Sequence, residues 1–218
     1  MPLLHDAALF ALDLLLPTRC VLCDRGEREL CEPCFTHASG PPRVERLADL
    51  NLCVSGANPE AVVTMLRRVK DRGQTRLCSH LARWLEPAVR LALDGAGLTV
   101  DHVALVVPPS PARSWRRRGF HPTAMTLRRT GARPLGLLGN ARRRRDQRDL
   151  NAVARAQNLI GAFRVRGSVA GVPVILVDDV VTTGSTLLEA KRALEGAGAL
   201  VLGAVALARV PLWRDTAN

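Results

Sequence analysis

The organisation of the chain is clearest in its late apolar segments. Residues 172–177 are apolar without interruption, which is typical of a central parallel strand that is buried on both faces. The strand is predicted to end at Asp178 and Asp179, and a helical pattern of apolar residues follows over 187–197. A last apolar segment at 199–209 predicts another strand, so we expect a right-handed parallel crossover here.

Shorter apolar segments predict further elements along the rest of the chain. Asn58 and Pro59 indicate a helix start, because Asn is a favoured N-cap and Pro is favoured at the first helical position. Strands are expected at 47–55, 100–107, 134–138 and 162–165, and helices at 4–16, 61–69, 77–95 with an interruption at Pro87, and 122–129. This alternation predicts a three-layer α/β fold with a mainly parallel sheet.

A hydroxyl-rich loop joins the late strand to its helix: Thr182, Thr183, Gly184, Ser185 and Thr186. A helix N-terminus presents unpaired backbone N–H groups and a positive dipole end, so this loop can bind a phosphate. The carboxylates of Asp178 and Asp179 cannot face that phosphate, but they can accept hydrogen bonds from vicinal hydroxyls or hold Mg²⁺ that contacts those hydroxyls. Ribose phosphate has both groups.

The segment 174–187 resembles the phosphoribosyl pyrophosphate (PRPP) binding motif of type I phosphoribosyltransferases. It has the same order of an apolar strand, Asp-Asp, two apolar residues, Thr-Thr-Gly and Ser-Thr. The resemblance implies that Asp178 and Asp179, the catalytic pair, bind the ribose hydroxyls and that 182–186 bind the ribose phosphate. The alternative is an ordinary strand-to-helix turn, in which Asp and Thr or Ser act only as caps.

Two Cys-x-x-Cys pairs near the N-terminus predict a metal site. Four thiolates match the tetrahedral coordination of structural zinc, although the spacer at 24–30 is shorter than usual. Disulfides are rare in a reducing cytoplasm, and a dithiol redox site needs only one pair. We therefore expect an N-terminal helix and zinc ribbon at 1–40, followed by a phosphoribosyltransferase-like domain at 41–218. The expected zinc ligands are Cys20, Cys23, Cys31 and Cys34.

Composition adds a large positive charge to this picture. The 218 residues are 47% hydrophobic, enough for a sizeable core, and carry a formal net charge of +11. Such a charge indicates polyanionic partners such as nucleic acid or phosphorylated metabolites, although a GC-rich genome also enriches Arg. The first 16 residues lack the basic opening and cleavage site of a signal peptide and are too short to span a membrane. A cytoplasmic protein without a membrane span is expected.

Arginines gather in a loop after the predicted strand 100–107. Three of them stand between Trp115 and Phe120, where they could bind phosphates while an aromatic ring stacks on a base. A solvated loop is the plain alternative, but ligands bind at the carboxyl ends of strands in open α/β sheets. A second basic segment, 140–158, is either a polar insertion or a phosphate-binding surface. Candidates for binding pyrophosphate or DNA are Arg68, Lys70, Arg113, Arg116, Arg117 and Arg118.

The order of these features is similar nearly end to end to the ComF (competence protein F) family, which joins a four-Cys zinc module to a phosphoribosyltransferase domain. The matching residues are Val107, Pro108, Arg113, Arg118, Gly119, Phe120, Gln147, Leu150, Arg155, Asn158 and Phe163. The chain departs from the family pattern in two places. The family's Asn-Gln is His121-Pro122 here, and its Leu-His is Pro109-Ser110.

The resemblance implies a role in natural transformation, the uptake of DNA. Its partners would be single-stranded DNA, a ribose-phosphate ligand such as PRPP or a nucleotide, and proteins of the DNA-uptake machinery. A second interpretation is an active Mg²⁺-dependent phosphoribosyltransferase that uses PRPP and an unknown acceptor. In that enzyme the acids would hold the ribose while basic residues stabilise the leaving pyrophosphate.

Overall fold

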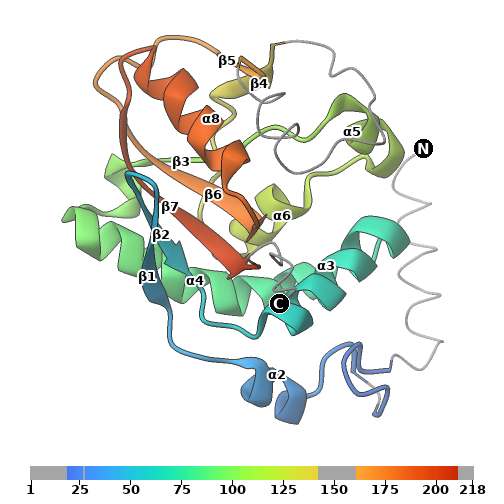
Figure 1. The fold of residues 1–218 in the computed structure, drawn as a ribbon. Helices are drawn as coiled ribbons and strands as arrows, with labels where there is room; N and C mark the ends of the chain where they lie inside the picture. The colour runs from blue at the N-terminus through green and yellow to red at the C-terminus, as the bar shows by residue number, and fades with distance from the viewer. Residues whose placement is uncertain (1–18, 27, 142–160, 211–218) are drawn as a thin grey trace, which may run out of the picture.

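The computed structural model describes residues 19–26, 28–141 and 161–210 (Figure 1). The predicted N-terminal helix and most of the basic segment 140–158 lie outside the described residues. Within them, the predicted α/β fold is confirmed.

Five strands form the central sheet, in the order β1-β2-β7-β6-β3. The outer hairpin of β1 and β2 is antiparallel, and every other neighbouring pair is parallel. The strands of this sheet are β1 (Arg43–Leu47), β2 (Leu50–Val54), β3 (Ala104–Val106), β6 (Pro173–Val181) and β7 (Leu200–Arg209). A separate antiparallel pair consists of β4 (Leu138–Asn140) and β5 (Phe163–Val165).

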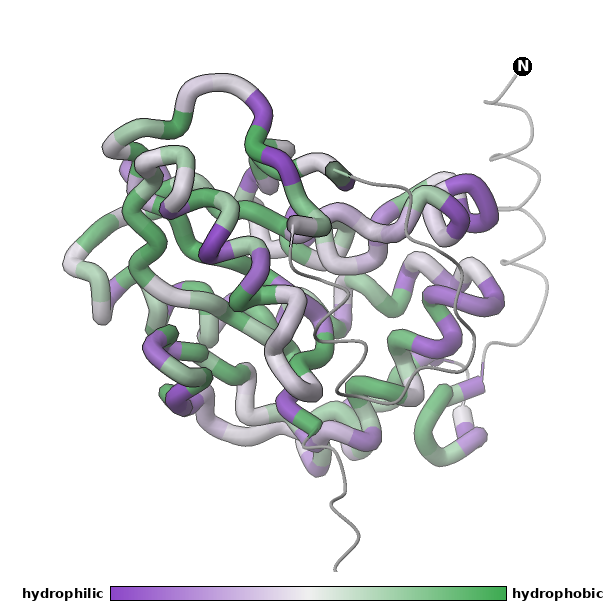
Figure 2. The backbone as a smooth tube through the Cα atoms, turned by 45° about the horizontal axis from the view of Figure 1, so that its top comes forward, coloured by the Kyte–Doolittle hydropathy of each residue, from purple (hydrophilic) through white to green (hydrophobic). Residues whose placement is uncertain are grey.

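Helices cover both faces of the central sheet (Figure 1). The helices are α2 (Glu32–Ala38), α3 (Pro59–Arg72), α4 (Leu77–Ala96), α5 (Ala112–Arg118), α6 (Pro122–Arg129) and α8 (Ser185–Glu195), with a 3₁₀ turn, η1, at Val100–His102. Helix α8 packs on one face, whereas α3, α4 and α6 pack on the other. Figure 2 shows hydrophobic residues along the inner segments and hydrophilic ones on the outer turns of the helices.

The apolar run of β6 supplies both cores because successive strand residues point to opposite faces. Ile175 and Val177 pack on the face of α3, α4 and α6, whereas Val174 and Leu176 pack on the face of α8. All four are at most 1% exposed. A strand in this position has no solvent-facing side, which explains the absence of polar alternation in its sequence.

After β3 and after β6 the chain continues on opposite faces of the sheet. These strands are parallel neighbours, but β3 leads to α6 on one face of the sheet and β6 leads to α8 on the other. Such a divergence opens a crevice beyond the carboxyl ends of the two strands, the usual ligand position in open α/β sheets. The topology therefore places the ends of β3 and β6 beside a candidate site.

Two helices differ from the sequence-based expectation. Helix α4 continues through Pro87, which was expected to interrupt it. Pro87 is exposed, so the carbonyl group four residues earlier, which loses its hydrogen bond, can be hydrated. The arginine-rich segment after β3 is the short helix α5 and not a loop, and it ends at Gly119 with a φ of 73°.

Several strand boundaries also differ. The strand expected at 47–55 contains β2, which pairs with β1 in a hairpin whose turn includes Ala48 at a φ of 53°. Strand β1 was missed because its charged residues lie on a largely exposed edge. Two other predicted strands are shorter or shifted, since 100–102 form η1 and the strand expected at 134–138 pairs over Leu138–Asn140.

In the parts of the chain that the structure describes, none of the helices combines the length and the apolar character needed to cross a membrane.

Candidate functional site

Asp178 and Asp179 lie within β6, which continues to Val181 and does not end at the acids as predicted. Backbone pairing with β7 persists beyond them, with Asp178 opposite Ala206 and Val181 opposite Arg209. The acids are therefore held by a sheet ladder and not by a flexible turn. The side chain of Asp179 faces Lys70 of α3, and both acids border the same cavity.

Backbone amides and one lysine satisfy the two carboxylates. Asp178 Oδ1 accepts a hydrogen bond of 2.8 Å from the Asp179 N–H, and Asp179 Oδ1 accepts one of 2.8 Å from the Val180 N–H. Asp179 Oδ2 lies 2.7 Å from Lys70 Nζ, at the last turn of α3. Asp178 has no corresponding cation among the described residues, so the two acids differ in charge environment.

This difference changes the protonation of Asp178. Burial is the main cause that raises the pKa of Asp178, to about 7, and the neighbouring carboxylate of Asp179 raises it further. The Asp179 N–H and Lys70 oppose the increase. At neutral pH Asp178 is therefore divided between its acid and its anion.

A cavity of about 350 Å³ lies over the acids, at the crevice between β3 and β6. One wall is the segment 108–111 after β3, and the opposite wall includes Phe163 of β5 and Thr186 of α8. Continuing the β3–β6 register by two residues brings Pro108 level with Asp178. The polar or charged lining residues are Lys70, Ser110, Ser114, Arg118, His121, Thr123, Asp178, Asp179 and Thr186.

His121 links the segment after β3 to the first turn of α6 by hydrogen bonds. Its Nε2 lies 3.1 Å from the carbonyl oxygen of Pro108, and its Nδ1 lies 3.4 Å from the Ala124 N–H in the first turn of α6. A carbonyl only accepts and an amide N–H only donates, so Nε2 carries the proton and Nδ1 is bare. Burial is the main cause that lowers the pKa of His121, consistent with this neutral form.

The hydroxyl-rich loop lies beside the cavity at the start of α8. Thr186 lines the cavity, and Thr182 and Thr183 are exposed. The Thr183 and Ser185 hydroxyl oxygens are 2.8 Å apart. The first amides of α8 lack carbonyl partners within the helix, so the loop can receive an anion from the cavity side.

The β1–β2 hairpin packs against this loop. Gly184 has a φ of 77°, which disfavours any residue with a Cβ atom. A Cβ placed there would also collide with the side chain of Leu47. Near the same turn, Lys191 of α8 pairs with Asp49 at 2.7 Å. The hairpin thus supports the loop although the two are far apart in sequence.

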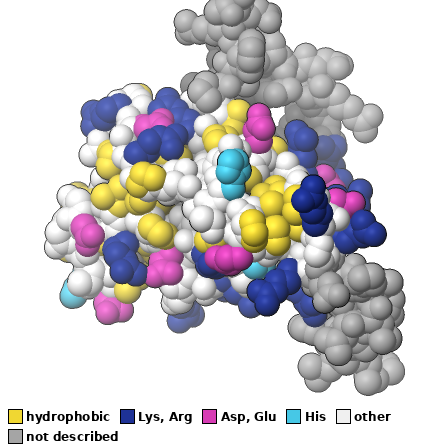
Figure 3. Space-filling model, turned by 90° about the horizontal axis from the view of Figure 1, so that it is seen from below, with side chains coloured by type: hydrophobic (Ala, Val, Ile, Leu, Met, Phe, Trp, Pro, Cys, Tyr) yellow, Lys and Arg dark blue, Asp and Glu magenta, His cyan; other side chains and the backbone are white. Residues whose placement is uncertain are grey.

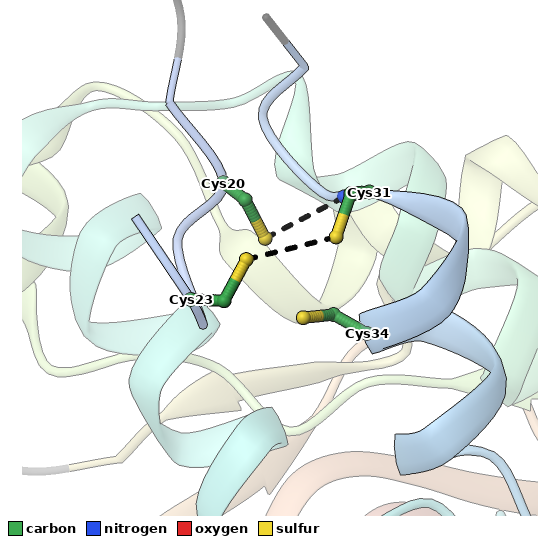
Figure 4. A group of neighbouring side chains, drawn as sticks. All are labelled: Cys20, Cys23, Cys31 and Cys34. Carbon is green, nitrogen blue, oxygen red and sulfur yellow. Dashed lines mark hydrogen bonds between the residues drawn. The ribbon is translucent and has the colours of Figure 1, made fainter. Parts of the chain in front are cut away.

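The four predicted zinc ligands meet at one point (Figure 4). Their sulfur atoms all lie within 4.8 Å of one another, and Figure 4 shows them directed toward a common centre. Cys23 Sγ and Cys31 Sγ are 3.7 Å apart, and a tetrahedral zinc site with Zn–S bonds of about 2.3 Å has S–S edges of about 3.8 Å. The four residues, Cys20, Cys23, Cys31 and Cys34, could therefore hold a metal ion such as zinc.

Thiol ionisation in this cluster also favours a cation. Although burial opposes it, backbone N–H groups, first that of Cys31, lower the pKa of Cys20 to about 6. The neighbouring thiol of Cys31 is the first cause that raises the pKa of Cys34. Four thiolates at these distances repel one another unless a metal ion balances their charge.

The cysteine cluster is packed against α4 through aromatic rings. Phe35 of α2 stacks on Trp84 of α4 with ring centroids 5.2 Å apart, and the Arg83 guanidinium lies 3.6 Å from the centre of the Phe35 ring. Trp84 Nε1 donates a hydrogen bond of 2.7 Å to Ser39 Oγ. These contacts join the cluster to the helix layer below the sheet.

Comparison with known proteins agrees with this architecture. The family model for the phosphoribosyl transferase domain matches residues 123–212. DNA utilization protein YhgH of Salmonella typhi is 32% identical over 183 residues, which cover 81% of this chain and 78% of that protein. The chain belongs to the ComF family. Competence protein F of Haemophilus influenzae is 35% identical over 167 residues, 72% of each chain, and YhgH of Escherichia coli K12 is 28% identical over 214 residues, 87% of this chain and 89% of that protein.

The cavity separates the basic candidates of the ComF-family protein into two groups. Lys70 and Arg118 line it, and Arg118 Nε is buried without a hydrogen-bond partner among the described residues. Arg117 lies outside and pairs with Asp71 at 3.5 Å between exposed side chains. The other candidates outside the lining are Arg68, Arg113 and Arg116.

Sequence reasoning missed several residues of the site. Phe163 was assigned to a strand and matched to the family pattern but not placed in the site, and Leu47 was not connected with the loop at Gly184. Thr123 is 2% exposed and lines the cavity, but nothing in its sequence context distinguishes it from an ordinary residue of a helix start. The His121-Pro122 pair was a usable signal, because a polar residue before Pro marks a helix N-terminus.

Removal of one cysteine tests the metal site. We expect about one zinc ion per native chain and no bound zinc in Cys31→Ala. The thermal midpoint of this variant should be lower than that of the native protein by roughly 5–10 °C, because the metal stabilises only the folded cluster. Zinc released on denaturation and thermal melting are the measurements. Cys53→Ala is the control, since Cys53 is buried in β2 away from the cluster. Equal zinc content in the two variants would contradict the assignment.

The raised pKa of Asp178 predicts a pH-dependent gain in stability on neutralisation. Folding favours its protonated form, so its contribution to stability is complete below the unfolded pKa of 3.8 and is lost as the pH rises to about 7. The free energy of unfolding of Asp178→Asn should therefore exceed that of the native chain by about 1–3 kcal/mol at pH 8, and this difference should disappear near pH 4. Urea unfolding at both pH values tests this. Exposed Asp94→Asn is the control, and a gain that does not vary with pH would refute the explanation.

Proposed function

We propose that this ComF-family protein acts in DNA uptake in the cytoplasm, that it binds a ribose-phosphate ligand, PRPP or a nucleotide, in the cavity over Asp178 and Asp179, and that it binds single-stranded DNA on the basic surface beside it. The observation that carries the proposal is the cavity itself. It brings an acid pair, a helix N-terminus and two basic side chains around one space. The names of the relatives, DNA utilization protein and competence protein F, support the DNA-related role.

The chemistry of the cavity suits a sugar phosphate. Asp178 and Asp179 offer acceptors for two neighbouring hydroxyls, and Thr186 with the start of α8 offers donors for a phosphate. Lys70 and Arg118 also line the cavity and supply positive charge for a pyrophosphate. A Mg²⁺ ion bound with PRPP would neutralise part of the pyrophosphate charge.

The size of the cavity favours one small ligand. At about 350 Å³ it lies near the lower end of the usual range for small-molecule sites, roughly 300–1,000 Å³. The acid pair also disfavours DNA as its occupant, because deoxyribose lacks the vicinal diol and the carboxylates repel a phosphodiester. We therefore assign the cavity to a ribose phosphate and the DNA to the outer surface.

The proposed DNA surface is the outer side of α5, at the lip of the cavity. Arg113, Arg116 and Arg117 are exposed there, and Trp115 is 51% exposed beside them. Arginine and an exposed aromatic ring are the groups that bind the phosphates and bases of a single strand. By contrast, on the face in Figure 3 the Lys and Arg side chains are scattered among acidic and apolar ones, without a continuous basic stripe.

Phosphoribosyl transfer is the second candidate function. The observation that favours it is the presence of the acid pair and two basic side chains in one cavity, because the acids could hold the ribose while the basic groups stabilise the leaving pyrophosphate. Such an enzyme would need an acceptor beside the ribose. Release of pyrophosphate from PRPP by the native protein, absent from the double variant Asp178→Asn/Asp179→Asn, would identify this activity.

The acid pair predicts selectivity for the ribose diol. Calorimetric titration of PRPP with Mg²⁺ should show binding to the native protein and binding weaker by about 10²-fold or more in Asp178→Asn/Asp179→Asn, since two charge-assisted hydrogen bonds are lost. Asp94→Asn is the control variant. Ribose 5-phosphate should also bind more tightly than 2-deoxyribose 5-phosphate. Equal binding of the two sugars would rule out the diol assignment.

The DNA surface predicts a defined salt dependence. Binding of a fluorescent single-stranded oligonucleotide should weaken with salt, and Arg116→Gln/Arg117→Gln should reduce the slope of log K against log salt by roughly 1.4, about 0.7 for each lost phosphate contact. Arg43→Gln/Arg90→Gln removes the same charge from exposed positions elsewhere and should leave the slope near its native value. If both double variants change the slope equally, the DNA does not bind at α5.

A further inference from the structure

We propose that Lys70 forms an ion pair with Asp179 in the ligand-free site and that its ammonium group moves to a phosphate of the ligand when the ligand binds. This inference rests on the proposed ribose-phosphate function of the cavity and assigns to Lys70 two alternating partners. It makes the lysine a positioning residue that keeps the acid pair ready for a diol and for a divalent cation.

The ion pair lies where the ligand must bind. Lys70 Nζ is 2.7 Å from Asp179 Oδ2, whereas Asp179 Oδ1 is already bonded to the Val180 N–H. The lysine therefore takes an acceptor position that a ribose hydroxyl or a divalent cation would use. A divalent cation at the acid pair competes directly with the ammonium group for Asp179 Oδ2.

The lysine is placed so that it can move. Its side chain is 31% exposed, and that of Asp179 is 13% exposed, so the pair borders the cavity and is not enclosed by the core. Lys70 belongs to the last turn of α3, and its backbone is anchored there by the neighbouring Val69, which is fully buried. A four-carbon stem on a fixed backbone lets the ammonium group change partners without refolding of the helix.

A destination for the ammonium group exists in the same cavity. Arg118 also lines the cavity, and its buried Nε has no hydrogen-bond partner in the part of the chain that the structure describes. Two cations close to one space repel each other until an anion enters between them. A phosphate in this position would draw Lys70 from Asp179 and satisfy Arg118 at the same time.

This arrangement predicts that loss of the Lys70 charge changes the affinities for a divalent cation and for a phosphate ligand in opposite directions. Lys70→Met keeps the apolar stem but removes the charge, so Mn²⁺ alone should bind the uncovered acid pair about fivefold more tightly, the value of a partly exposed ion pair. PRPP should bind the same variant about tenfold more weakly, because one charged hydrogen bond to its pyrophosphate is lost. Manganese relaxation measurements and calorimetry report the two affinities without requiring catalysis.

Arg72→Met is the matched control, because Arg72 lies in the same last turn of α3 but is exposed and outside the cavity lining. Both affinities should stay at the native value in this variant. Thermal melting checks that each variant is folded, and Lys70→Gln replaces Lys70→Met if the latter is not.

The outcomes separate the inference from the proposed function. Opposite changes in Lys70→Met support the exchange of partners. If Mn²⁺ binding is unchanged or weaker, Lys70 does not cover the acids, and the inference is wrong even when ribose 5-phosphate binds the native protein. If the native protein binds neither ribose 5-phosphate nor PRPP, the proposed function of the cavity fails, and the exchange fails with it.

Discussion

Negative charge at the end of a buried apolar strand is the constraint on which the rest of the site depends. Asp178 and Asp179 are held within the last part of β6 by pairing with β7, so they cannot separate to reduce their repulsion. The two acids have different surroundings. Asp179 receives an ammonium group from α3, and Asp178, which has burial without a cation, binds a proton more tightly. The acids are thus unequal although they are adjacent in sequence.

The elements that surround this acid pair come from distant parts of the chain. Helix α3 supplies Lys70, the segment after β3 supplies the proline-rich wall, and α8 supplies the helix N-terminus. They converge because β3 and β6 are parallel neighbours whose following helices lie on opposite faces of the sheet. His121 then fixes the wall to α6 through one imidazole ring. The topology of the sheet creates the cavity, and single polar contacts determine its shape.

Local sequence was sufficient for features formed by neighbouring residues. The apolar run before Asp178 predicted a central strand, and the spacing of the cysteines predicted their cluster. Contacts between distant segments could not be predicted in this way. Lys70 meets Asp179, and Leu47 meets Gly184, only because parallel strands and a hairpin bring them together. The interruption predicted at Pro87 is wrong because the effect of proline on a helix depends on which side faces water, and periodicity alone does not decide that.

The support of the Gly184 loop by Leu47 has a consequence for how the protein can be divided. The match to the phosphoribosyl transferase domain covers 123–212, which includes both acids and the loop. A fragment cut to those limits would lose the hairpin that packs against the loop, the strand beside β7 and the cavity wall after β3. Its sequence signature would be intact, but its binding surface would be incomplete. The smallest working unit is therefore longer than the segment by which the family is detected.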